Sequence, residues 1–261
     1  MTNLFLSFQP LNQPSMSKTI ATQRRHFEIR ETAVTIICEE IYLATAQESI
    51  FRSREVIERF IREDPLFRDT LEPYAEPADA DPLIRRMCDA GRAAEVGPMA
   101  SVAGAIAEQA IGDLVAAGSE QAIVDNGGDI AMFLSEATDV ALYAGRSPVK
   151  NIGFRMPGDR RKRGVCTSSG TVGPSISFGV ADAAVVFSSN VALADACATR
   201  LGNEVKNGDE DVMKAALRTV CKIEGVDAAL VVVGEKIAML GKLPELVKVK
   251  AGIDRISRIE Y

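Results

Sequence analysis

The stretch from Val165 to Asn203 constrains the fold of this chain most. Its small residues over Thr167–Gly179 lead into an apolar strand, Ala183–Phe187, and then into a helix that carries Asp195 and Thr199. Because these two residues are four positions apart, a helix places them on one face. A carboxylate and a hydroxyl beside a glycine- and serine-rich loop could hold a hard cation and the phosphates of a nucleotide.

Two interpretations of Asp195 and Thr199 stay open at this point. Their oxygens suit Mg²⁺ or Ca²⁺, and Mg²⁺ commonly takes few protein ligands and completes its shell with water and substrate phosphate. Alternatively, Asp195 caps or decorates a helix and Thr199 bonds back to a carbonyl of its own helix. Spacing alone favours this second interpretation.

Two further segments are candidates for ligand binding. One follows an apolar strand and reads Asn126-Gly127-Gly128-Asp129. Its glycines would let backbone approach a ligand, although an Asn-Gly hairpin turn explains them equally well. The other begins Thr167-Ser168-Ser169-Gly170-Thr171 and could present N–H groups to an anion or form an ordinary turn. Asp129 and Asp182 are carboxylates that could act as a base.

The rest of the chain mixes helices with strands at hairpin spacing. Residues 27–38 predict a long strand or a hairpin bent near Glu31-Thr32, and a helix is expected over 47–63. Segment 66–80 is expected to be irregular, and Arg160–Arg163 to form a solvated turn. The pattern predicts an α+β fold with helices on a largely antiparallel sheet. Residues 1–20 are expected to be a flexible arm and 21–261 a single domain.

Composition excludes several classes of function. The net charge of −6 disfavours nucleic acid as the main partner, because phosphate contacts need a basic surface. A single histidine, His26, rules out a histidine-based triad or a multi-histidine metal site within one chain. Five widely spaced cysteines predict reduced thiols and a cytoplasmic protein. No signal peptide is recognisable, and no apolar run approaches the roughly 20 residues of a membrane span, so no membrane is expected.

Taken in order, three motifs resemble those of the ApbE superfamily. Its members have a strand that ends in a Gly-Gly-Asp turn, a Thr-Ser-Gly loop and an Ala-Asp-x-x-Ala-Thr helix. This chain has Gly127-Gly128-Asp129, Thr167-Ser168-Ser169-Gly170 and Ala194-Asp195-Ala196-Cys197-Ala198-Thr199. The similarity spans roughly residues 95 to 205. Each motif is weak alone, but three in order at the separation of the family are fairly specific.

The resemblance implies a fold, a cofactor and a reaction. The fold would be α+β of the ApbE type, related to T-fold units, with FAD between the sheet and the helices. Mg²⁺ would be held by the aspartate and threonine that match Asp195 and Thr199, together with a backbone carbonyl. Typical members transfer FMN from FAD to a threonine of a target protein.

The chain also departs from the pattern of the family transferases. Where these carry a lysine in a Gly-Lys-Gly-Tyr segment, this chain reads Gly97-Pro98-Met99-Ala100. Where they carry His-x-x-Asp-Pro, it reads Ser175-Ile176-Ser177-Phe178-Gly179, without a histidine. The lipoprotein signal is missing too. The pattern resembles a shorter cytosolic branch, found in anaerobes and archaea, of which some members are linked to homocysteine formation from sulfide.

Three hypotheses about function follow. The first is an ApbE-like cytosolic protein that binds a flavin or related nucleotide with Mg²⁺ and supports sulfur or redox metabolism. The second is a divergent FMN transferase in which Asp182 or Asp129 replaces the missing base. The third is a non-catalytic assembly or interaction subunit that keeps the fold. The expected partner is a small-molecule nucleotide or flavin, and a protein partner and an oligomer stay open.

Overall fold

The fold is built on one large antiparallel sheet. The computed structural model describes residues 5–7, 20–29, 32–145, 147–169 and 178–249. In these residues an eight-stranded sheet has the order β11-β10-β9-β8-β5-β4-β3-β2, and all its neighbours pair antiparallel. Its strands are β2 (Gln23–Ile29), β3 (Thr32–Cys38), β4 (Ala122–Asn126), β5 (Asp129–Phe133), β8 (Lys162–Ser168), β9 (Ala183–Ser188), β10 (Val226–Val233) and β11 (Lys236–Gly241). The predicted α+β class and the predicted hairpin over 27–38 are therefore confirmed.

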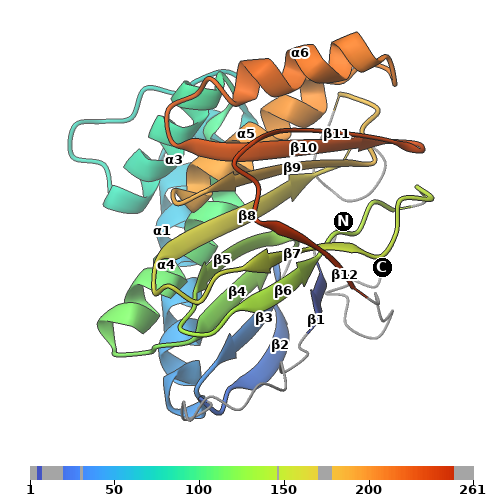
Figure 1. Cartoon of the computed structure of the whole chain (residues 1–261). Coiled ribbons are helices and arrows are strands. Elements are labelled where there is room, and N and C mark those ends of the chain that lie inside the picture. Colours follow the sequence, from blue (N-terminus) through green and yellow to red (C-terminus); the bar gives the residue numbers. More distant parts are fainter. Residues whose placement is uncertain (1–4, 8–19, 30–31, 146, 170–177, 250–261) are drawn as a thin grey trace.

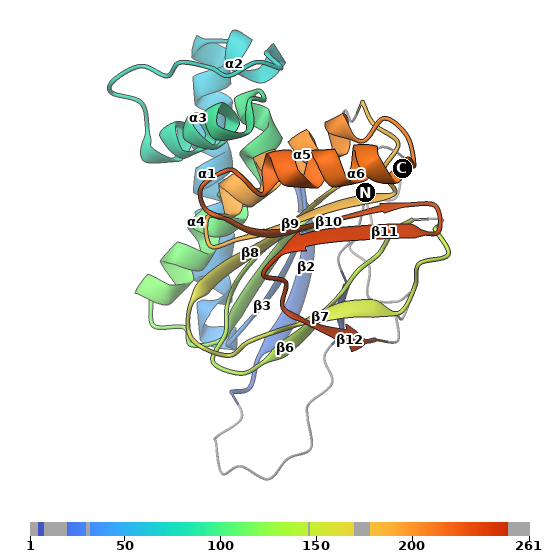
Figure 2. The ribbon, with the colours of Figure 1, turned by 45° about the horizontal axis from the view of Figure 1, so that its top comes forward.

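Helices cover one face of this sheet, and a second, smaller sheet covers the other (Figures 1 and 2). The helices are α1 (Leu43–Glu63), α2 (Leu66–Asp69), α3 (Pro82–Ala94), α4 (Val102–Ala116), α5 (Val191–Glu204) and α6 (Glu210–Val220), with 3-10 turns η1 (Glu40–Tyr42) and η2 (Pro98–Ser101). The smaller sheet has the order β1-β6-β7-β12 and consists of β1 (Phe5–Ser7), β6 (Thr138–Ala141), β7 (Ile152–Met156) and β12 (Glu245–Lys248).

Two cores result from the alternation of side chains along the strands. Val124 of β4 packs in the core under the helices, whereas its neighbour Ile123 packs in the core between the two sheets. Successive residues of a strand point to opposite faces, so a strand covered on both faces is apolar throughout. The sequence pattern predicts strands at 140–143, 151–156 and 246–249, which correspond to β6, β7 and β12, but it predicts neither β1 nor the pairing of these strands in a separate sheet.

Strand β8 corrects two predictions. The sequence predicts a solvated turn at Arg160–Arg163 and a loop from Thr167; Arg160 and Arg161 are exposed in the connection before β8, but β8 begins at Lys162 and continues through Thr167 to Ser168. The strand pairs with both β5 and β9, and these ladders satisfy its backbone. Lys162 forms an ion pair with Glu108, which is buried under the sheet. Basic and hydroxyl side chains therefore occupy a central strand here.

Several element boundaries follow from local signals. The sequence Asp81-Pro82 predicts a helix N-cap followed by proline at the first helical position. The carboxylate of Asp81 accepts a hydrogen bond from the Leu83 N–H at 2.8 Å, and Pro82 is the first residue of α3. Gly118, which has a φ of 103°, follows the end of α4. Segment 66–80, predicted to be irregular, contains the short helix α2.

The predicted N-terminal arm lies largely outside the described residues. Within residues 1–20 the structure describes Phe5–Ser7 and Ile20. Phe5–Ser7 forms β1 and pairs antiparallel with β6. The domain boundary near residue 20 stays a prediction.

One helical segment among the described residues, Pro98–Ala116, is long and apolar enough to cross a membrane by length and composition. It comprises η2 and α4, and half of the segment is buried in the protein. Helix α4 packs against α1, α5, β4 and β5. Its apolar composition is accounted for by this position in the core.

Candidate functional site

Asp195 caps helix α4 from the neighbouring helix α5. Its Oδ2 accepts a hydrogen bond from the Gly104 N–H at 2.8 Å, and the Ala103 N–H also bonds the carboxylate. Ser101, the residue at the start of α4, makes no side-chain cap bond of its own. The first N–H groups of a helix lack partners within it, so a carboxylate there is favourable. Asp195 therefore caps a helix, as the second interpretation of the sequence proposes.

Gly104 allows this close approach. A Cβ at this position would lie 2.8 Å from the Asp195 Cβ and 2.7 Å from the Val191 carbonyl oxygen. Real Cβ atoms do not approach other atoms so closely, so a larger residue would push α4 and α5 apart. The sequence predicts close packing of α4 at this glycine against a sheet or a ligand, and the structure shows that its neighbour is α5.

Asp129 lies beside Asp195, at the start of β5. The turn before it consists of Gly127 and Gly128, which have φ values of 68° and 105°, as a two-residue hairpin requires. The Asp129 Oδ1 accepts a hydrogen bond from the Thr167 N–H at 3.2 Å. Asn126 donates from Nδ2 to the Ala103 carbonyl oxygen at 3.1 Å. The hairpin turn is thereby tied to the end of β8 and to the start of α4.

We call the carboxylates of Asp129 and Asp195 the acidic pair. Both side chains are buried, and neither forms an ion pair with another described residue. Burial raises the pKa of Asp129 to about 7, although hydrogen bonds from the Thr167 backbone and the Cys166 thiol oppose the rise. Burial and the charge of Asp129 raise the pKa of Asp195 well above its ordinary value. Two buried carboxylates without a cation disfavour each other's ionisation.

The oxygen atoms near the acidic pair are suitable ligands for a hard cation. The acidic pair offers oxygen ligands, and the half-buried Thr199 lies one turn after Asp195 on α5. The hydroxyl of Thr167 is buried and has no hydrogen-bond partner among the described residues. In the described part of the chain, no three His, Cys, Asp or Glu residues gather in a metal-binding arrangement. Mg²⁺ needs only one or two carboxylates when a substrate supplies phosphate oxygens, so the residues fit this ion.

Glu108 is a further buried carboxylate at the junction of α4 and α5, and the sequence pattern did not identify it. It lies on α4, is buried, and its Oε2 accepts hydrogen bonds from the N–H groups of Val191 at 2.7 Å and Ala192 at 3.1 Å. Lys162 pairs with its other oxygen. An acidic residue within the otherwise apolar face of α4 was the available signal. Glu108 thus caps α5 from α4, as Asp195 caps α4 from α5.

The structure brings most of the predicted site residues to one end of the large sheet. The β4–β5 hairpin contributes Asn126, Gly127, Gly128 and Asp129, and the end of β8 contributes Thr167 and Ser168, directly followed by Ser169. Gly170 and Thr171 lie outside the described residues.

Asp182 lies in a different environment from that of the acidic pair. Its Oδ2 accepts a hydrogen bond from the Gly234 N–H at 2.7 Å, at the turn between β10 and β11. No hydrogen bond to the acidic pair is found for it among the described residues. Its role as a base stays a prediction, and the geometry ties Asp129 more closely to Asp195.

Comparison with known proteins gives three kinds of match. A family model described as "AbpE bacteria" matches residues 17–251. The UPF0280 protein of Methanosarcina acetivorans is 45% identical over 251 residues, which are 96% of this chain and 99% of that protein. The UPF0280 protein of Methanococcoides burtonii is 46% identical over 226 residues, 86% of this chain and 95% of that protein.

Two solved structures share the fold at low identity. The ApbE protein of Thermotoga maritima superposes with a TM-score of 0.57 at 12% identity, over 84% of this chain and 96% of that one. The flavin transferase ApbE of Vibrio cholerae superposes with a TM-score of 0.52 at 12% identity, over 84% and 97% of the two chains. At these identities the likeness establishes the fold and leaves the chemistry to the residues of this chain.

Proposed function

Because this chain belongs to the AbpE bacteria family, within the ApbE superfamily, we propose that it binds a flavin or related nucleotide with Mg²⁺ at the acidic pair. One observation carries the proposal. Two carboxylates, Asp129 and Asp195, are buried near enough for the charge of Asp129 to raise the pKa of Asp195, and neither has a cation among the described residues, whereas the buried Glu108 has Lys162. An uncompensated buried charge is costly, and a bound divalent ion removes that cost.

The residues divide between the metal and the nucleotide. Asp195 and Thr199 would hold Mg²⁺, with Asp129 facing them, and the ion would neutralise phosphate oxygens of the nucleotide. The N–H groups of Ala103 and Gly104 hold the Asp195 carboxylate in place. The glycine turn between β4 and β5 and the end of β8 would lie next to the phosphates, because both are at the same end of the sheet and glycines allow backbone to approach a ligand closely.

A second candidate function, FMN transfer from FAD to a threonine of a target protein, is favoured by the pKa of Asp129. A general base works best when its pKa lies near the operating pH, and burial raises the pKa of Asp129 to about 7. In such a transfer the threonine oxygen bonds to the FMN phosphorus, the bond to the AMP oxygen breaks, and Asp129 accepts the hydroxyl proton. Transfer of FMN to a threonine-containing peptide, lost in Asp129→Asn, would support this role.

Calorimetric titration of FAD into the protein, with and without Mg²⁺, tests the primary proposal. We expect FAD to bind, Mg²⁺ to tighten binding at least tenfold, and Asp195→Asn to remove this Mg²⁺ effect. Asn keeps an acceptor for the Gly104 N–H while it removes the charge, so the cap persists. The matched control is Asp113→Asn on the surface of α4, where Arg52 pairs with the carboxylate.

Two results would contradict the proposal. One is the absence of any heat of binding for FAD under both conditions, which would favour a non-catalytic assembly subunit instead. The other is an equal Mg²⁺ effect in Asp195→Asn and in the wild-type protein.

A further inference from the structure

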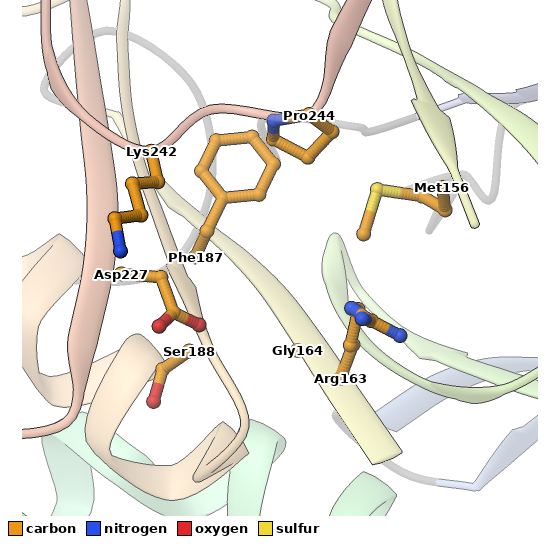
Figure 3. Close-up of a pocket in the computed structure, with 8 residues that line it drawn as sticks. All are labelled: Met156, Arg163, Gly164, Phe187, Ser188, Asp227, Lys242 and Pro244. Atoms are coloured by element: carbon orange, nitrogen blue, oxygen red, sulfur yellow. The ribbon is translucent and has the colours of Figure 1, made fainter. Parts of the chain in front are cut away.

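A cavity that does not include the acidic pair lies on the other face of the large sheet. It has a volume of about 220 Å³ and is lined by Met156, Arg163, Gly164, Phe187, Ser188, Asp227, Lys242 and Pro244 (Figure 3). Strand β8 contributes to it through Arg163, near its start, whereas Thr167 near its end bonds Asp129. Met156 belongs to β7 of the smaller sheet. The cavity is thus separate from the site proposed for the nucleotide.

The floor of this cavity is apolar and firmly held. Met156 and Phe187 are 1% and 3% exposed, and Pro244 lies above them on the connection from β11 to β12. The ring of Phe187 packs edge-on against Phe154, with ring centroids 4.9 Å apart. Only a small part of the Met156 and Phe187 side chains is open to the cavity, which leaves room for contact with one small apolar group of a ligand.

Opposite charges stand at the rim. Strand β11 ends at Gly241, whose φ is 96° and at which a Cβ would collide with the backbone of Asp227 and Ala228. This turn lets the Lys242 N–H donate to the Asp227 carbonyl oxygen at 2.9 Å, so both side chains start from adjoining positions. Neither the Lys242 ammonium nor the Asp227 carboxylate forms an ion pair with another described residue, although the charge of Asp227 contributes to the raised pKa of Arg163.

The remaining cation of the cavity is already engaged. Arg163 donates two hydrogen bonds to the Asp159 carboxylate, one of them from Nη2 to Oδ2 at 2.6 Å. A ligand with several negative charges would therefore find a single available cation, Lys242, next to the Asp227 carboxylate. Lys242 can instead bind one negatively charged group of a ligand, and Asp227 can bind one positively charged group.

From the apolar floor and the unpaired charges of Lys242 and Asp227, we infer that this cavity binds a small zwitterion with an apolar side chain, the chemistry of a free α-amino acid. The carboxylate of the ligand would meet Lys242, its ammonium Asp227, and its side chain Phe187 and Met156. The volume supports a ligand of this size, because pockets for drug-sized molecules start at about 300 Å³.

Calorimetric titration with three probes of similar shape tests the inference. L-leucine carries both charges, 4-methylpentanoate lacks the ammonium, and 3-methylbutylamine lacks the carboxylate. We expect L-leucine to bind the full-length protein at least tenfold more tightly than either analogue, because only L-leucine satisfies both rim charges. Equal affinity for 4-methylpentanoate would overturn the zwitterion assignment, and the absence of L-leucine binding would overturn the site.

Rim variants complete the test. Lys242→Glu and Asp227→Asn should each weaken L-leucine binding at least tenfold, and both positions are exposed, so the fold is not at risk. The matched control is Lys248→Glu, the same reversal at an exposed position of β12 outside the cavity. Unchanged affinity in Lys242→Glu, or an equal loss in Lys248→Glu, would contradict the inference.

Discussion

Asp195 and Glu108 are both buried carboxylates where α4 and α5 meet, and each accepts backbone hydrogen bonds from the first turn of the other helix. They differ in what surrounds their charge. Glu108 pairs with Lys162, whereas Asp195 has Asp129 beside it and no cation among the described residues. Capping and ion pairing therefore account for Glu108 within the protein. Capping alone leaves the charge of the acidic pair uncompensated, and this is the end of the sheet where a cation would bind.

The largest effect expected from this difference is a pH dependence that Asp129 imposes. The pKa of Asp129 is about 7 in the folded protein, whereas an unfolded aspartate titrates near pH 4. Between these values the folded chain holds a proton that the unfolded chain releases, so the free energy of unfolding falls as pH rises. Relative to the wild-type protein, Asp129→Asn should gain up to about 4 kcal/mol between about pH 4 and pH 8.

Urea unfolding in EDTA at a series of pH values measures this gain. The difference between variant and wild-type protein cancels the titration of groups that do not interact with Asp129, and Asp195, whose pKa the Asp129 charge raises, contributes to the measured difference. An excess of Mg²⁺ should reduce the gain, since the ion stabilises the ionised acidic pair. If the two stability curves ran parallel over the whole pH range, the pKa of Asp129 would not be raised in the folded protein. The acidic pair would then not differ from Glu108 in its need for a cation.

A smaller loss is expected when Glu108 is removed. Glu108→Ala leaves the N–H groups of Val191 and Ala192 and the charge of Lys162 without their partner. Because Lys162 is partly exposed and can be solvated, we expect a loss of about 3 kcal/mol, at the lower end for a broken buried pair. The readout is the midpoint of urea denaturation.

The control for this loss is Glu210→Ala on α6. Glu210 is exposed and pairs with Lys214 one turn later, so its removal should cost less than about 0.5 kcal/mol. Similar losses in the two variants would show that Glu108 contributes no more than a surface ion pair.

The smallest change in stability is expected at Gly104, where α4 and α5 pack closely together. Gly104→Ala should destabilise the protein by about 2 kcal/mol, because its Cβ would collide with α5. Gly112→Ala in the same helix should stabilise it by up to about 1 kcal/mol, since no atom lies within 4 Å of a Cβ there. Thermal unfolding of both variants gives the comparison, and a stabilising Gly104→Ala would show that the helices can separate without cost.

The sequence predicted those parts of the site that depend on local chemistry. Adjacent glycines at 127 and 128 allowed either close approach to a ligand or a tight hairpin turn, because they adopt positive φ at little cost, and the turn is present. The four-residue spacing of Asp195 and Thr199 placed both on one helix. Asp81 followed by Pro82 predicted the start of α3. The resemblance to the ApbE superfamily, based on the order of the motifs, is confirmed by the family match.

Contacts between distant residues were beyond the reach of the sequence pattern. Lys162 looked solvated because its partner, Glu108, is 54 positions away along the chain. Asp182 was a candidate base on the sequence, yet its carboxylate accepts a hydrogen bond from the turn at Gly234, 52 positions further on. The cavity at Lys242 forms only because β7, β8, β9 and the chain after β11 converge, and no local pattern marks it.

Local sequence thus determined the α+β class and the helix caps and turns. It also determined that Asp195 and Thr199 lie on one face of a helix. These features depend on the spacing of residues that are close along the chain. The tertiary structure decided which carboxylate has a cation and which does not. Glu108 and Asp195 are both acidic residues in largely buried helices, and only the packing of α4 and α5 on β5 and β8 gives one of them Lys162 and the other Asp129. Burial and neighbouring charge set the behaviour of a carboxylate, and both are properties of the folded chain.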